Sequence, residues 1–307
     1  MIAYLKNIHY MKKMQNKTLI ALSFLSVCGA LTACSADDKQ TMNTDGRSVR
    51  QLTIAEVPLT RATLTDNATT LAAAWKAGDP ATYLNLNSFG PYTMDYGTLT
   101  ASSSEATSAF TGEVRCKMGD KVALIYPATS PITDGTDRGK FTINLAGQTG
   151  TLADMAQRFH YVYGVAEVTS VTGTTATATR AEMKSLLVAC KFTFMDENDN
   201  PIPVKTLSIS YGTDLSASFP QTCALTPNVD PAQVSVPENL VPAGTPLSIT
   251  LDTETEDGVY VALFPINGLT LFFSVHNSTG TGYTGTASAT LKAGRFYPAT
   301  IKLEKEL

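Results

Sequence analysis

Short apolar segments that alternate with polar residues recur along most of the chain. Alternating segments lie at 50–57, 191–194, 207–210 and 247–251, and nearly continuous apolar runs lie at 121–126, 259–264 and 269–275. Alternation with a period of two predicts strands buried on one face, whereas a short continuous run predicts a strand buried on both faces. The chain therefore reads mainly as a series of short strands.

Turn-forming residues separate these segments, and many short strands joined by such turns are typical of β-sandwiches. The Thr-rich stretch at 169–179 predicts a long surface loop or hairpin. A boundary near residues 179–182 would give two sandwiches of similar size. We therefore expect an N-terminal β-sandwich domain at 50–181 and a C-terminal one at 182–307.

Two short helices are expected within this otherwise all-β fold. Asp66 precedes apolar residues at Leu71 and Trp75, and the pattern stops at 78–80 (Gly-Asp-Pro), which predicts a helix capped by Asp66. The second helix is expected at 151–159, where Thr and Asp three residues apart approximate a capping box.

The first 34 residues combine a basic start at 12–17, an apolar run at 18–30 and the ending Leu31-Thr32-Ala33-Cys34. This order is that of an export signal peptide, and the apolar run is too short to span a bilayer comfortably. Its last four residues resemble a bacterial lipobox, in which the Cys is acylated, so we expect a signal peptide at 1–34 and lipid on Cys34. The alternative is an ordinary signal peptide with a chance cysteine. Met11 precedes the basic run and is a more natural start than Met1.

Residues 35–49 are polar and charged, and they are expected to form a flexible tether between the lipid and the first strand. Beyond the leader the chain carries 19 basic and 27 acidic residues. This acidic balance offers no basic patch for nucleic acid. Cys116, Cys190 and Cys223 lack metal-ligand spacing and read as small buried thiols, although one disulfide among them stays open.

Several segments, taken in order, resemble the fimbrillin family: subunits of the major and minor fimbriae of Gram-negative anaerobes, including anchor and tip lipoproteins. The similar segments are the lipobox with its acidic follow-up, the first strand ending at Arg61-Ala62, and 75–79, 110–113, 122–127, 186–194, 259–265 and 291–297. The resemblance spans nearly the whole chain. It implies two tandem β-sandwich domains of transthyretin-like topology, which agrees with the strand pattern.

The resemblance also implies an assembly mechanism. Family precursors are cut after an Arg that ends the first strand, and the matching position here is Arg61, followed by the small Ala62. The first strand, with Leu52, Ile54 and Val57, would then be displaced, and a strand from a neighbouring subunit would add to the opened sheet.

Alternatives to this processing remain. Arg61 would otherwise be a solvated turn residue, and Arg47 and Arg50 in the tether are rival cut sites. The chain offers no strand beyond its last predicted one, so a tip or anchor position is expected rather than a stalk position. The expected partners are other fimbrial subunits and the outer membrane, at the cell surface.

Candidate catalytic chemistry is sparse, so we expect no enzyme activity, metal or cofactor. His160 and His276 stand outside any metal-spaced pair, and the segment 196–200 (Asp-Glu-Asn-Asp-Asn) lacks the Gly and distal Glu of a calcium loop. That segment is expected to be a hairpin turn.

The aromatic residues Phe89, Tyr92 and Tyr96 cluster in a predicted loop containing Gly and Pro. They would either anchor this loop on the first sandwich or stack on a glycan. The main functional hypothesis is therefore a structural fimbrial subunit that mediates adhesion to a host or glycan ligand. The alternative is a glycan-binding surface lipoprotein of a nutrient-uptake system.

Overall fold

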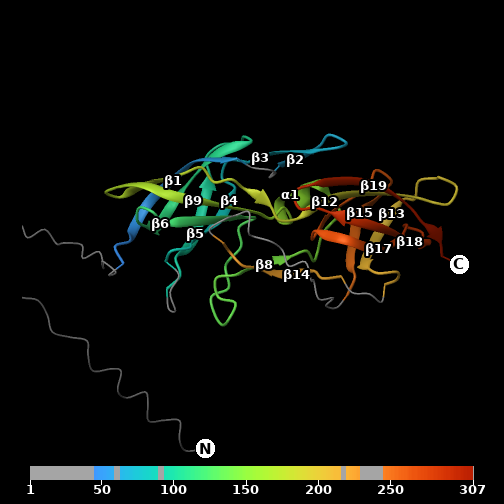
Figure 1. Ribbon diagram of the computed structural model, residues 1–307. Helices are drawn as coiled ribbons and strands as arrows, with labels where there is room; N and C mark the ends of the chain where they lie inside the picture. The colour runs from blue at the N-terminus through green and yellow to red at the C-terminus, as the bar shows by residue number, and fades with distance from the viewer. Residues whose placement is uncertain (1–44, 59–62, 89–92, 216–218, 229–244, 307) are drawn as a thin grey trace, which may run out of the picture. The chain divides into compact units, whose positions relative to one another are not determined.

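The structure is a computed structural model that describes residues 45–58, 63–88, 93–215, 219–228 and 245–306 (Figure 1). These residues form strands β1–β20 and a single short helix, α1, which confirms the predicted all-β class. The bounds are β1 Ser48–Pro58, β2 Thr63–Asp66, β3 Leu71–Ala74, β4 Pro80–Asn85, β5 Tyr96–Ala101, β6 Thr107–Cys116, β7 Lys121–Tyr126, β8 Phe141–Asn144, α1 Leu152–Arg158, β9 Val162–Thr172, β10 Thr175–Ala178, β11 Lys184–Ser185, β12 Val188–Met195, β13 Val204–Tyr211, β14 Thr222–Leu225, β15 Leu247–Thr255, β16 Val259–Leu263, β17 Ile266–His276, β18 Gly282–Leu291, β19 Phe296–Lys302 and β20 Glu304–Lys305.

Seven strands between residues 48 and 178 close into a ring. Their order is β10-β1-β6-β5-β4-β7-β9, and β10 also pairs with β9, while β11 extends the sheet beyond β9. Register shifts in the β1–β6 and β10–β9 ladders mark bulges, which bend strands and aid closure. The ring differs from the open two-sheet sandwich that the sequence predicts for residues 50–181, because β10 bonds neighbours on both of its edges.

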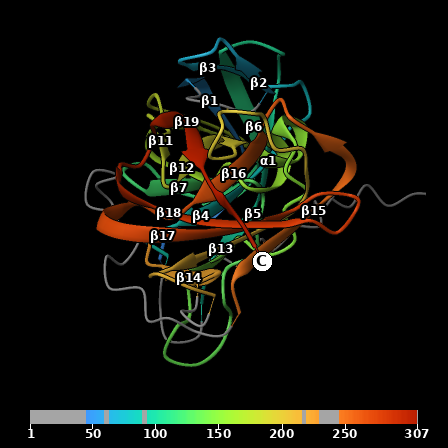
Figure 2. The ribbon, with the colours of Figure 1, turned by 90° about the vertical axis from the view of Figure 1, so that its right-hand side faces the viewer.

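The second half contains a three-stranded sheet, β16-β12-β19, and a five-stranded sheet, β15-β13-β17-β18-β20. Figure 2 shows β19 and β12 on one side and β17 and β18 on the other. The rings of Phe192 and Phe194 meet the ring of Phe273 edge-on, at centroid distances of 5.1 and 5.8 Å. These contacts join the two sheets through an aromatic core.

The predicted boundary at 181/182 stays a prediction. β14 pairs with β8, so one short ladder joins strands from either side of that boundary. One apolar cluster likewise includes Leu84 and Ile125 of the ring's strands and Phe192 and Phe273 of the second half.

The helix predicted from Asp66 is wrong. β2 and β3 form an antiparallel hairpin there, and Ala68 in its turn has a φ of 67°. Asp66 Oδ1 accepts a hydrogen bond from the Ala68 amide, and Oδ2 accepts from Lys191 Nζ at 3.0 Å and Tyr260 Oη at 2.6 Å. Asp66 therefore stabilises a turn instead of capping a helix, because residues distant in sequence also bind its carboxylate.

The second helix is confirmed. The Thr151 side chain caps α1 by accepting a hydrogen bond from the Asp154 amide. The Thr-rich stretch forms the β9–β10 hairpin, which turns at Gly173. No helix in the described part of the chain is long and apolar enough to cross a membrane.

Candidate functional site: the closing strand of the ring

β1 is the strand that completes the ring, and it lies between two unlike neighbours, β6 and β10. It runs antiparallel to β6 from Ser48 to Pro58 and parallel to β10 from Gln51 to Ile54. Without β1, the remaining order would be β6-β5-β4-β7-β9-β10, with β6 and β10 as open edges. Because β1 precedes the other strands along the chain, its removal would open the sheet without interrupting the chain between them.

The inward side chains of β1 are large, whereas the facing positions are mostly small. Leu52, Ile54 and Val57 are fully buried. Leu52 lies opposite Gly112 on β6 and Ala176 on β10, while Ile54 lies opposite the large Phe110 on β6 and the small Ala178 on β10. We call the place of β1 between β6 and β10 the slot. In this structure it is filled by a strand with bulky apolar side chains at alternating positions.

Trp75 holds the far end of β1. Its indole Nε1 donates a hydrogen bond to the carbonyl oxygen of Val57 at 2.7 Å. The ring is 1% exposed and meets the rings of Phe110 and Tyr126 edge-on, at 4.7 and 5.3 Å between centroids. This bond satisfies a backbone acceptor beside the bulge between Ile54 and Val57.

The near end of β1 is held by a buried ion pair. Arg47 Nε donates to Asp120 Oδ2 at 2.6 Å, and Arg47 Nη2 donates to Asp120 Oδ1 at 2.7 Å. Both side chains are buried, at 7% and 2% exposure. Asn85 Nδ2 and the Lys117 amide also donate to Asp120, at 2.8 and 3.1 Å. The fork-to-carboxylate geometry is the strong, specific form of this interaction.

Further charges surround this pair. Asp45 accepts from the Arg47 amide, from Arg47 Nη1 and from Arg115 Nη2, and its carbonyl accepts from Lys117 Nζ. Arg115 Nη1 also pairs with Asp95 at 2.7 Å. We call Asp45, Arg47, Asn85, Arg115, Lys117, Asp95 and Asp120 the Arg47 cluster. It fastens the residues before β1 to the turn between β6 and β7.

The charges of the cluster stabilise one another's ionised forms. Burial raises the pKa of Asp120, but the hydrogen bonds from Arg47, Asn85 and the Lys117 amide outweigh it and leave that pKa lowered. The Arg47 amide, with the Arg115 and Arg47 guanidinium groups, lowers the pKa of Asp45 to about 2 against the effect of desolvation. The hydrogen bond to Asp120 raises the pKa of Arg47 against its burial. At neutral pH these three groups are therefore charged.

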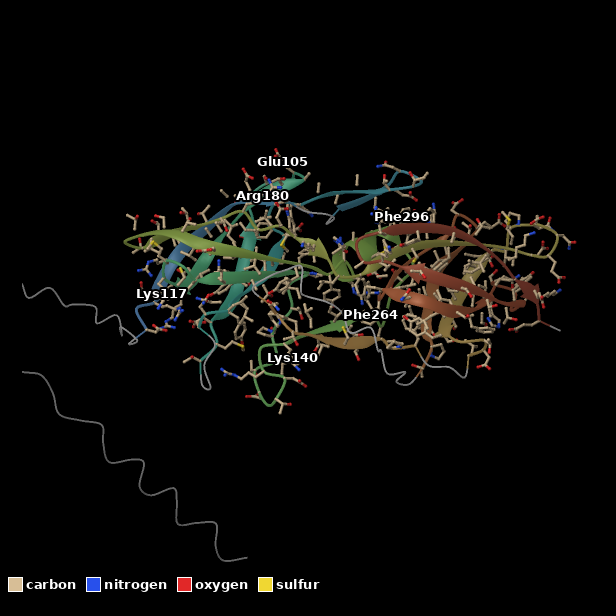
Figure 3. The ribbon with its side chains drawn as sticks, viewed as in Figure 1. Glu105, Lys117, Lys140, Arg180, Phe264 and Phe296 are labelled. Atoms are coloured by element: carbon tan, nitrogen blue, oxygen red, sulfur yellow. The ribbon has the colours of Figure 1, made fainter. Side chains whose placement is uncertain are left out.

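The two ends of β1 are distinct in charge placement. Figure 3 shows Lys117, a member of the Arg47 cluster, at one end of the ring, and Arg180 at the other. Arg180 Nη1 pairs with Glu56 near the end of β1 at 3.2 Å, and both side chains are more than half exposed. The strong ionic contact is therefore at the start of β1, and the weak one at its end.

The structure places the predicted site residues unequally. Leu52, Ile54 and Val57 lie together in β1, whereas Cys34, Arg61 and Ala62 lie outside the described residues. β1 begins at Ser48, two residues before the predicted start, and Arg47, placed in the tether by sequence, is buried. Arg50 is half-buried and donates to the carbonyls of Ser48 and Cys116.

Sequence reasoning missed the role of Arg47 and Asp120. The two residues are 73 positions apart, and neither belongs to a recognisable motif. The available signal was the density of charge at 45–50 directly before an alternating strand, which is also typical of an exposed tether.

Of the remaining candidates, the structure gives a role only to the acidic segment at 196–200. Asp196 accepts hydrogen bonds from Asn198 and Asn200 within a hairpin turn, which confirms the predicted turn. Phe89 and Tyr92 lie outside the described residues, and Tyr96 is partly exposed at the start of β5.

The three cysteines of the fold are free thiols. Cys116 and Cys190 are buried, and Cys223 is partly exposed. Desolvation raises the pKa of all three thiols, that of Cys223 to about 12. These thiols are therefore protonated at neutral pH and act as small packing residues.

Within the described ranges no group of three or more His, Cys, Asp or Glu residues is arranged to hold a metal. His160 is buried, and His276 lies 3.8 Å from Glu306 at the surface. Among the described residues, neither histidine belongs to such a group.

No protein-family model matches the chain, and no curated protein does. Solved structures do. A candidate cell adhesion protein from Bacteroides uniformis aligns at a TM-score of 0.50 and 17% identity, over 86% of this chain and 98% of that chain. A second candidate cell adhesion protein, from Bacteroides ovatus, aligns at a TM-score of 0.51 and 14% identity, over 85% of this chain and 97% of that chain. The tip fimbrial protein Mfa3 from Porphyromonas gingivalis, with a C-terminal truncation, aligns at a TM-score of 0.44 and 9% identity, over 83% of this chain and 95% of that chain.

The first two alignments cover nearly all of both chains, so they concern the whole fold rather than one sheet. At these identities the similarity is one of fold. The fold of this chain is therefore similar to that of the candidate cell adhesion proteins of Bacteroides.

Proposed function

We propose that the protein is a surface-anchored structural subunit of a fimbria, which accepts a strand from a neighbouring subunit and serves in adhesion. The observation that carries this proposal is the position of β1, which closes the ring with three fully buried side chains. The fimbrillin-like segments and the similarity of fold to candidate cell adhesion proteins support it. In this proposal lipid on Cys34 holds the precursor at the outer membrane.

Removal of β1 is the central step. A cut after Arg61 would separate β1 from the rest of the chain, because β1 ends at Pro58. The opened sheet would expose the edges of β6 and β10, and exposed edges readily pair with another chain. A foreign strand would restore the ladder and refill the slot by β-augmentation.

The energetics favour replacement over an empty slot. Burial of Leu52, Ile54 and Val57 contributes about 1.5–3 kcal/mol each, before the costs of ordering a strand. An emptied slot loses this burial together with the β1 ladder, while an incoming strand with similar side chains recovers both. Association costs reduce the net gain.

The structure distinguishes the candidate cut sites. Proteolysis requires the chain to fit extended into a protease, and the Arg47 side chain is instead buried against Asp120. Arg50 lies inside β1, within its ladder to β6. We therefore expect an Arg-specific protease to spare Arg47 and Arg50 in the folded chain and to cut after Arg61.

The test is limited digestion of the purified full chain with an Arg-specific protease, followed by mass spectrometry. We expect one early product that starts at Ala62, with the β1 fragment still bound in size-exclusion chromatography until a competing strand peptide is added. Arg61→Gln should abolish this product, whereas the matched control Arg180→Gln, at an exposed arginine, should not. Early cutting after Arg47, or a chain that resists the protease, would refute this processing.

A further inference from the structure

The end of the slot at the β6–β7 turn has its own chemistry. Asp120 and Asn85 are both buried. Both belong to elements that remain when β1 is gone, since Asn85 ends β4 and Asp120 precedes β7. Asp45 and Arg47, by contrast, would leave together with β1.

Departure of β1 would leave this carboxylate without its cation. Asp120 would keep the hydrogen bonds from Asn85 Nδ2 and the Lys117 amide, and it would lose both bonds from Arg47. Arg115 already pairs with Asp95. A new strand that covers this end with an apolar or acidic residue would bury a carboxylate that lacks a counter-charge, which is strongly unfavourable.

We infer that the slot selects a strand carrying an arginine or lysine at the end that reaches Asp120, besides the bulky apolar residues that fill the ring. This inference depends on the strand-accepting function proposed above. In this chain the cation, Arg47, directly precedes β1 and stands five residues before Leu52, the first buried apolar residue of that strand. The partner is therefore an apolar strand of another subunit that is preceded by a basic residue. Arginine is favoured because its guanidinium group makes two parallel hydrogen bonds to a carboxylate.

Charge placement, rather than net charge, is the recognised feature. Gln51 is an exposed position of β1 and lies opposite the exposed Glu113 of β6. A cation moved there would still meet an acidic neighbour at the surface. It would nevertheless leave Asp120 buried and unpaired, so a strand with the same composition should bind less well.

The test uses the full chain with residues 59–62 replaced by the recognition sequence of a site-specific protease. After cutting, fluorescein-labelled peptides spanning Asp45–Pro58 are exchanged into the slot, with mild urea if release of the old strand is slow, and binding is followed by anisotropy. Three peptides are compared: the native sequence, one with Arg47→Lys, and one that combines Arg47→Gln with Gln51→Arg.

We expect the native peptide to bind tightest and the Arg47→Lys peptide to follow. The charge-relocated peptide should bind on the order of tenfold more weakly or worse, as for truncation of a buried charge pair. In an Asp120→Asn chain this discrimination should shrink to about twofold or less. If that variant fails to fold, the comparison of the three peptides on the native chain still decides.

Two failures are distinguishable. If the native and charge-relocated peptides bind within about twofold of each other, the requirement for a preceding basic residue is overturned and the strand-accepting function stands. If no peptide binds, the native sequence included, the strand-accepting function is overturned together with this inference.

Discussion

Replacing Asp120 with Ala should destabilise the ring through the charge that it leaves behind. The substitution removes both hydrogen bonds that Arg47 donates to the carboxylate, at 2.6 and 2.7 Å. It also leaves Asn85 Nδ2 and the Lys117 amide without this acceptor. Arg47 keeps its contact with Asp45 at 3.1 Å, so its charge is not entirely uncompensated.

The magnitude follows from burial. Removing one partner of a buried ion pair costs about 3–5 kcal/mol, because the other charge stays buried. The remaining Asp45 contact is partly exposed, at 36% of that side chain, and offsets little. We therefore expect the free energy of unfolding to fall by about 3 kcal/mol. Replacing both partners together, as Arg47→Leu with Asp120→Leu, should restore most of this loss because no charge is then stranded.

The assay is equilibrium urea unfolding of the full chain, followed by the fluorescence of Trp75, which is the chain's single tryptophan. The matched control is Asp137→Ala, which removes the same group from an exposed ion pair with Lys140. That control should cost about 1 kcal/mol or less. If Asp120→Ala costs no more than Asp137→Ala, or if the double substitution is worse than the single one, the buried pair does not hold β1 as argued.

Three further outcomes are expected. The pKa values of Asp45 and Asp120 are lowered in the folded chain, so these carboxylates stabilise the fold at pH values above their unfolded pKa of 3.8. The melting temperature should therefore fall as the pH drops from about 4 towards the pKa of about 2 for Asp45, and it should fall less steeply in Asp120→Asn. Equal slopes in both proteins would contradict this. Trp75→Phe keeps an aromatic ring but removes the hydrogen bond to the Val57 carbonyl, so it should cost about 1–3 kcal/mol in urea unfolding, followed by circular dichroism because the variant has no tryptophan. It should also speed hydrogen exchange at the end of β1 before its start. A side chain at Gly112 would meet the Thr98 carbonyl oxygen at 2.7 Å, so Gly112→Val should destabilise by about 1–3 kcal/mol, and unchanged stability would show that β5 and β6 can separate freely.

The strands were largely predictable because their pattern is local. The alternation at Leu52 and Ile54 gives a period of two, and the structure places both inside the ring. The helix at Thr151 was predictable for the same reason, since its cap lies within three residues. Local chemistry therefore fixed most element types.

The hairpin of β2 and β3 was not predictable from such patterns. Leu71 and Trp75 are four residues apart, which suits one face of a helix as well as the end of a strand. Their conformation is settled by distant partners: Trp75 bonds to Val57, and Asp66 bonds to Lys191 and Tyr260. These contacts join positions up to 194 residues apart, which a single sequence does not reveal.

Closure of the ring was missed for a related reason. β10 reads as one arm of a Thr-rich hairpin, and nothing in its sequence shows that its second edge pairs with β1. The Arg47–Asp120 pair likewise joins a supposed tether to a turn. The candidate site was therefore predictable as a strand, while its closing role and its ionic anchor emerged only from the fold.

The contacts that hold β1 imply that cutting the chain and releasing β1 would be two separate steps. A cut after Arg61 breaks one covalent link, but it leaves the ladder to β6, the buried side chains and the Arg47 cluster in place. Each of these contacts is lost only when β1 leaves, and water alone offers no replacement for the apolar burial. The cut chain should therefore keep its own β1 bound. The bound strand covers the edges of β6 and β10, so these edges cannot pair with other chains at random. In the proposed assembly a competitor would have to match both the apolar slot and the buried carboxylate, so the contacts that hold β1 would also determine which strand replaces it. The fragment that stays bound after digestion is the direct measure of this retention, and its spontaneous loss would mean that β1 is held too weakly to select its successor.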